Sequence, residues 1–162
     1  MNRVAMQIRL SHIEEIKFVD NTQNYKCDLK KDSVHVGFSV QLNPDIEQNR
    51  TDILLGVHYD IKKEGRKTSI LEYKINVTFE IEDMIEYISI EKNRISVKPE
   101  LLTIMLSVSI GSLRGMLVMR TKNSDFENYP LPLVNVTELV SKIRHPSWYE
   151  NTIHPFFKFR YQ

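Results

Sequence analysis

The sequence has one cysteine and almost no net charge, and each of these shortages argues against a class of protein. Cys27 is the only cysteine among 162 residues, so no disulfide can form within the chain, which fits a reducing cytoplasm. The formal net charge of +1 gives no electrostatic reason to expect a nucleic acid or an acidic lipid surface as a partner. We therefore expect a cytoplasmic protein with no nucleic-acid partner.

Long uninterrupted apolar runs are also lacking. The longest near-apolar stretch, residues 101–119, is interrupted by Arg114, by two glycines and by serine and threonine residues. A membrane-spanning helix needs about 20 mostly apolar residues. The amino-terminal stretch MNRVAMQIRLSHIEE has no apolar segment of the kind found in signal peptides. We therefore expect no membrane insertion.

Three stretches of the sequence alternate between apolar and polar residues. They are residues 34–42, 52–61 and 70–81, and their apolar members recur at every second position. A period of two places the apolar side chains on one face of a strand, and a sheet with one apolar and one polar face is typically antiparallel. A less regular stretch, 6–18, is predicted to be a fourth strand with a bulge near Ser11–His12, with a helix as the alternative.

Two helices are predicted after the strands. Pro99 fits the first turn of a long helix that continues to about Arg120 and whose apolar residues are spaced by three and four. Asn135 followed by Glu138 has the spacing of a capped helix start, and this shorter helix would end near Arg144. The acidic and mixed stretch between the last strand and Pro99 is predicted to be a long connection.

The order of these elements predicts one α+β domain that covers the whole chain, 1–162. We expect a four-stranded antiparallel sheet with one long and one short helix packed on one face. The core would span about 6–144, and an aromatic and basic extension would follow over 145–162. A length of 162 residues agrees with one domain, because domains usually contain roughly 100–200 residues.

No motif in the sequence supports an enzyme, so we expect no catalytic residue and no cofactor. Cys27 has no neighbouring base, and no glycine-rich phosphate loop or catalytic triad is present. His35 and His58 could share a metal ion on the polar side of the sheet, but no further ligands occur at a spacing typical of zinc. We therefore expect both histidines to be solvated side chains that bind no metal. A small enzyme with strands wrapped around a helix is the remaining enzymatic alternative, with Glu100 as a poor candidate carboxylate.

An acidic cluster lies at the end of the last predicted strand. Its members are Glu80, Glu82, Asp83 and Glu86. Such a cluster is either a solvated strand end or a docking surface for a basic partner.

The long helix carries a stripe of small residues. Ser107, Gly111, Gly115 and Val118 recur at spacings of three or four, and Arg114 lies beside them. Glycine costs about 1 kcal/mol relative to alanine in a helix interior, and close approach of another backbone can offset that cost. The stripe therefore predicts a seam against another helix or the sheet. Arg114 would anchor this seam, with a solvated arginine at the helix edge as the alternative.

The loop after the long helix alternates apolar residues with prolines. Its apolar members are Phe126, Tyr129, Leu131 and Leu133. Proline favours an extended backbone. The loop either covers the core or lines an apolar groove that accepts other polypeptide chains.

In the order of its elements and in the stretches LRGMLVMRT and LPLVNVTEL, the sequence resembles the SecB family of export chaperones. In that family the long helix typically carries an arginine, and an extended loop leads into a stretch of the type L-x-P-V-N-F-x-x-L. The residues that carry the match are Leu131, Val134, Asn135 and Leu139. Leu133 stands where the family has proline and Val136 where it has phenylalanine. The resemblance is mainly one of architecture.

The resemblance implies an ATP-independent chaperone, a holdase, that binds unfolded or export-destined polypeptides in apolar grooves. It also implies a homotetramer, a dimer of dimers with the long helices packed at the interface. The groove would be lined by Phe126, Tyr129, Leu131 and Leu133, with Tyr59 and Tyr73 either contributing to it or lying in the core. The interface would contain the small stripe and Arg114.

The charge and the tail differ from those of a standard SecB protein, which is strongly acidic and has a polar tail. Here the chain is near neutral, and the extension over 145–162 is aromatic and basic. The acidic cluster stays a candidate docking surface for a SecA-like motor. The chain is more similar to divergent members of the family, some of which serve toxin–antitoxin systems, so a cognate antitoxin is the alternative partner. A non-enzymatic binding or assembly module on the same fold, toxin–antitoxin-associated or from a mobile element, is the alternative function.

Overall fold

A long antiparallel sheet dominates the computed structural model, which describes residues 5–24, 34–92, 94–143 and 152–153. Its long strands are β1 (Ile8–Asp20), β2 (Val34–Asp45), β3 (Arg50–Lys63) and β4 (Arg66–Ile81). They lie in the order β1-β4-β3-β2, and the two-residue strand β7 (Thr152–Ile153) adds to the β2 edge. The predicted α+β fold with four antiparallel strands and two helices is thus confirmed, whereas β7 was not predicted.

The irregular first strand is a strand with two bulges, so the helix alternative is wrong. Its register with β4 shifts between Leu10 and His12, as predicted, and again between Glu15 and Lys17. Cross-strand partners point to the same face of a sheet, and Leu10 and Phe18 pair with the buried Phe79 and Tyr73. The bulges therefore keep Ile8, Leu10, Ile13 and Phe18 on one face although their spacing in the sequence is uneven, whereas Val19 pairs with Glu72 on the other face.

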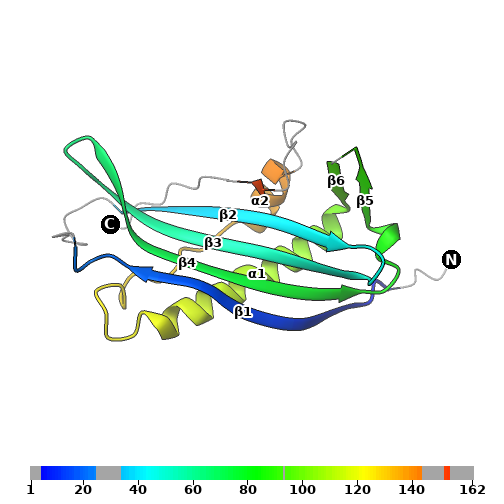
Figure 1. Ribbon diagram of the computed structural model, residues 1–162, viewed down its shortest axis with the longest axis horizontal. Helices are drawn as coiled ribbons and strands as arrows, with labels where there is room; N and C mark the ends of the chain where they lie inside the picture. The colour runs from blue at the N-terminus through cyan, green and yellow to red at the C-terminus, as the bar shows by residue number, and fades with distance from the viewer. Residues whose placement is uncertain (1–4, 25–33, 93, 144–151, 154–162) are drawn as a thin grey trace.

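Two helices follow the strands, as predicted. α1 (Pro99–Arg120) begins with proline in its first turn, and α2 (Val136–Ile143) is capped by Asn135, whose side-chain oxygen accepts the backbone N–H of Glu138 at 3.1 Å. Figure 1 shows α1 running along one face of the sheet. Its predicted apolar ridge is buried there and comprises Leu102, Leu106, Ile110, Leu113 and Leu117.

The connection between β4 and α1 contains elements that the sequence did not predict. A short 3-10 turn, η1 (Met84–Glu86), leads into a second, two-stranded sheet of β5 (Ile88–Glu91) and β6 (Arg94–Val97). Figure 1 shows this hairpin standing apart from the main sheet, near the start of α1. Strands of four residues are too short for a period of two to stand out from the surrounding sequence.

The core lies between the sheet and α1. The apolar rows of β2, β3 and β4 are fully buried, and the largest side chains among them are Tyr59, Tyr73, Phe38 and Phe79. Burying a side chain of this size contributes roughly 1.5–3 kcal/mol. By length and composition α1 is long and apolar enough to cross a membrane, and 44% of its most apolar window is buried inside the structure. Cys27, Arg144 and most of 145–162 lie outside the described residues.

Candidate functional site

The small stripe of α1 lies on the side of the helix that faces away from the sheet. A Cβ atom added at Gly111 or at Gly115 would meet no other atom within 4 Å. Ser107 is exposed as well, and Val118 is 48% exposed. The stripe was predicted to pack against another helix or against the sheet. The sheet of the same chain does not contact it, so the prediction of the sheet as its partner is wrong. Nothing in the described part of the chain covers the stripe.

Apolar side chains widen this uncovered side of α1. Ile104 and Met119 are exposed next to the stripe, Met119 by 67%. β1 lies beside the end of the helix, because Arg120 forms an ion pair of 3.0 Å with Glu15. Leu10 of β1 is exposed although it belongs to the helix-facing row. α1 and the β1 edge thus present a surface of small and apolar residues that a second chain could bury.

Arg114 binds the loop of its own chain. Its Nε donates to the carbonyl oxygen of Leu131 at 3.3 Å and its Nη2 donates to that of Pro132 at 2.9 Å. The side chain is half-buried. Arg114 is therefore neither a solvated edge residue nor, within this chain, an anchor across the seam; it holds the extended loop against α1.

Most of the predicted groove residues lie in the core. Phe126 is 1% exposed and Leu131 is 3% exposed. The Tyr59 hydroxyl donates to the carbonyl oxygen of Tyr129 at 3.0 Å, and the rings of Tyr59 and Phe126 meet edge to face with centroids 5.7 Å apart. The loop therefore covers the core here, which was the alternative to a groove.

Two further groove candidates differ sharply in accessibility. Tyr73 is fully buried, and burial together with the nearby Glu15 carboxylate raises the pKa of its phenol to about 12. Leu133 is 85% exposed, directly after the carbonyls that Arg114 holds. Leu133, and in part the half-buried Tyr129, are therefore the members of the predicted groove that an incoming polypeptide can reach.

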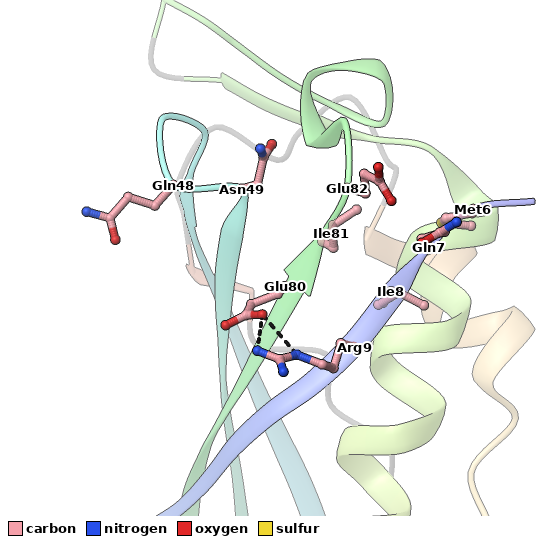
Figure 2. Close-up of a pocket in the computed structure, with 9 residues that line it drawn as sticks. All are labelled: Met6, Gln7, Ile8, Arg9, Gln48, Asn49, Glu80, Ile81 and Glu82. Carbon is pink, nitrogen blue, oxygen red and sulfur yellow. Dashed lines mark hydrogen bonds and ion pairs between the residues drawn. The ribbon is translucent and has the colours of Figure 1, made fainter.

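One member of the acidic cluster, Glu80, forms an ion pair with Arg9 of the neighbouring strand. Both the Nε and the Nη2 of Arg9 donate to one carboxylate oxygen of Glu80, so the charge of Glu80 is matched within the chain. Figure 2 shows this pair among the residues that line a hollow of about 550 Å³. Glu82, Asp83 and Glu86 are exposed around η1. Because Glu80 is paired with Arg9, the predicted docking surface is reduced to these three residues.

The polar face of the sheet holds a buried carboxylate between two basic groups. Asp60 Oδ2 lies 3.2 Å from His58 Nε2 and 3.3 Å from Lys67 Nζ. Burial alone would raise the pKa of Asp60, but the hydrogen bonds and charges of His58 and Lys67 outweigh burial and hold this pKa below its ordinary value. His35 stands opposite Asp60 on β2, and its Nδ1 is buried without a hydrogen-bond partner. The described residues contain no group of three potential ligands placed for a metal.

Comparison of the chain with models of protein families, with curated proteins and with solved structures finds no match. The assignment of a function therefore depends on the geometry and on the resemblance stated above.

Proposed function

We propose that this protein is a SecB-like holdase that assembles as a homotetramer through the outer side of α1 and retains unfolded polypeptides without ATP. The observation that carries the proposal is the uncovered stripe around Gly111 and Gly115 on the longest helix of the molecule. Two glycines inside a helix cost about 1 kcal/mol each relative to alanine. Packing against the same helix of another protomer offsets that cost, because glycine allows two backbones to approach closely.

Exposed apolar groups support the holding of a client polypeptide. Leu133 is 85% exposed and Tyr129 is half-buried, and both lie on the loop whose carbonyls at Leu131 and Pro132 are bound by Arg114. Each contact with an unfolded chain is weak, but many contacts along one chain add through effective concentration. Binding of the unfolded state opposes aggregation and folding by mass action. In this proposal the protein is cytoplasmic and delivers its client to a SecA-like motor or serves a cognate antitoxin.

A non-enzymatic assembly module is the second candidate function. The observation that favours it is the burial of Phe126, Leu131, Tyr59 and Tyr73, which removes most of the expected groove. An assembly module needs the α1 seam but no surface for unfolded chains.

The test combines the mass of the assembly with the suppression of aggregation. We expect the wild type to be a tetramer by light scattering and to suppress aggregation of a chemically denatured model protein at stoichiometric amounts. The double variant Gly111→Leu with Gly115→Leu should lose the tetramer. Because both added side chains enter open space in the single chain and leucine is a better helix former than glycine, the folded protomer of the variant should be no less stable than that of the wild type.

A matched control adds two leucines at the same spacing elsewhere. Thr137→Leu with Ser141→Leu changes two exposed positions of α2 and should leave the mass unchanged. An unchanged mass in the glycine double variant rejects the seam. A wild-type tetramer that fails to suppress aggregation rejects the holdase and favours the assembly module.

A further inference from the structure

The turn between β3 and β4 concentrates positive charge in a chain that is almost neutral overall. Its sequence over 62–67, KKEGRK, has four basic residues and one acidic residue. Lys62 and Arg66 are exposed, and no described residue forms an ion pair with either of them. Net charge does not report such a local concentration of cations, and net charge was the only ground for expecting no nucleic-acid partner.

This turn is the tip of a narrow ribbon that projects from the sheet. Val34, at the start of β2, pairs with Ile61, and Asp20, at the end of β1, pairs with Leu71. Among the described residues, those over 62–68 therefore pair as strands only with each other. The two residues of the turn have φ values of 50° and 76°, as in a tight two-residue hairpin turn. Figure 1 shows the ribbon, in teal and green, extending beyond the neighbouring strands.

The two strands of the ribbon place basic residues directly opposite one another. Lys62 pairs with Lys67, and Lys63 pairs with Arg66. Like charges opposite each other destabilise a pair of strands, and the Asp60 carboxylate lies beside only Lys67, 3.3 Å from its Nζ. Because consecutive residues of a strand point to opposite faces, Arg66 lies on one face of the ribbon and Lys62 and Lys67 on the other. An anion that extends along both faces would relieve the repulsion.

The shape of the ribbon favours a nucleic-acid groove as that anion. A flat anionic surface, such as a membrane, contacts one face of a ribbon, whereas a groove between two phosphate backbones contacts both. The major groove of B-form DNA is about 12 Å wide and admits a two-stranded ribbon. The major groove of duplex RNA is too narrow and deep for side chains to read. The tip sequence KKEGRK has no apolar residue, unlike the core of a protein–protein interface.

We propose that the β3–β4 ribbon inserts into the major groove of double-stranded DNA, with Lys62 and Arg66 bound to phosphates of the two groove walls. This inference goes beyond the proposed holdase function and does not depend on it. Contacts to phosphates carry no sequence information, so the binding depends little on the base sequence.

The opposite end of the molecule is acidic and orients it on DNA. Glu82, Asp83 and Glu86 are exposed around η1, directly after β4. β4 has 16 residues, which at about 3.3 Å per residue separate the two charged ends by roughly 50 Å. Phosphates attract the ribbon and repel the η1 end, so the molecule approaches DNA with the ribbon first.

The test measures the binding of the full chain to a short fluorescein-labelled DNA duplex by fluorescence anisotropy at several salt concentrations. We expect the double variant Lys62→Gln with Arg66→Gln to bind at least about tenfold more weakly at low salt. The slope of log affinity against log salt concentration should become shallower by about 2, because each lost phosphate contact removes about 1. The charge-conserving variant Lys62→Arg with Arg66→Lys should bind like the wild type.

A matched control removes two cations elsewhere. Lys92→Gln with Lys122→Gln changes two exposed lysines outside the ribbon and should leave the affinity and the slope unchanged. No binding of the wild type to the duplex, or an equal loss in the control variant, rejects the proposal. Equal affinity for an RNA duplex of the same sequence rejects insertion into the major groove. Tighter binding to phosphatidylserine vesicles than to DNA assigns the ribbon to a membrane surface and also rejects the proposal.

Discussion

Gly37 shows how a single residue shapes the polar face of the sheet. It pairs with His58 across β2 and β3, and a Cβ atom at position 37 would lie 2.3 Å from His58 Nε2. Real Cβ atoms do not approach so closely, so the imidazole of His58 occupies the space that any other residue would need. The glycine thereby allows His58 to lie beside Asp60, and a carboxylate can be buried in this face because His58 and Lys67 neutralise it.

We expect Gly37→Ala to lower the unfolding free energy by about 1–3 kcal/mol. The added methyl group displaces His58 and thereby weakens its contact with Asp60. Chemical denaturation measures the change. The control is Ser141→Ala, which changes an exposed position of α2 and should alter the unfolding free energy by less than about 0.5 kcal/mol. A Gly37→Ala chain as stable as the wild type would show that His58 moves at no cost.

Asp60 makes stability depend on pH in the acidic range. Its folded-state pKa lies below the ordinary value of 3.8. The stabilisation from its ionised form is therefore complete above pH 3.8 and is lost as the pH falls through the lower, folded-state pKa. We expect Asp60→Asn to cost about 1–2 kcal/mol at neutral pH and progressively less in strong acid.

Denaturation curves of the wild type and of Asp60→Asn, measured from neutral pH to below pH 3.8, check this dependence. Asp125→Asn, which changes an exposed carboxylate of the loop after α1, is the control for general acid effects. A stability difference between the wild type and Asp60→Asn that stays constant over the whole range would mean that Asp60 has no depressed pKa.

At the scale of elements, α1 is a helix with two different sides. The apolar ridge on one side is buried on the sheet, while Ser107, Gly111 and Gly115 face outward. Arg114 lies between these two sides and reaches the carbonyls of Leu131 and Pro132. One arginine therefore joins the longest helix to the loop that leads into α2.

We expect Arg114→Ala to lower the unfolding free energy by about 1.5–3 kcal/mol, because two backbone carbonyls lose a charged donor. The loop should also become a site of limited proteolysis between Phe126 and Leu133. Arg66→Ala, at the exposed turn between β3 and β4, removes an arginine without such bonds and serves as the control. Equal protease resistance of the wild type and the Arg114→Ala chain would contradict the role of Arg114 in holding the loop.

The elements differ in how far their sequence predicts them. β1 was predicted together with its first bulge, since the spacing between Leu10 and Ile13 departs from two. The hairpin of β5 and β6 was missed because each strand has only four residues. β7 has two residues, too few for a sequence period, and it is a strand because it pairs with β2.

At the scale of the whole molecule, the sheet has one covered face, one polar face and two different edges. β1 forms one edge and lies beside the uncovered side of α1. β2 forms the other edge and carries β7. Assembly through the outer side of α1 would therefore involve the β1 side of the molecule.

The sequence by itself determined the four long strands, the two helices and most of the faces that they bury, because periods of two and of three to four residues follow from local backbone geometry. It also located the stripe of Gly111 and Gly115. Only the tertiary structure decided that Phe126 and Leu131 close the core, that Arg114 binds its own loop and that β7 returns to β2. These outcomes depend on contacts between residues far apart in the chain, and local patterns do not encode which distant surface a segment meets.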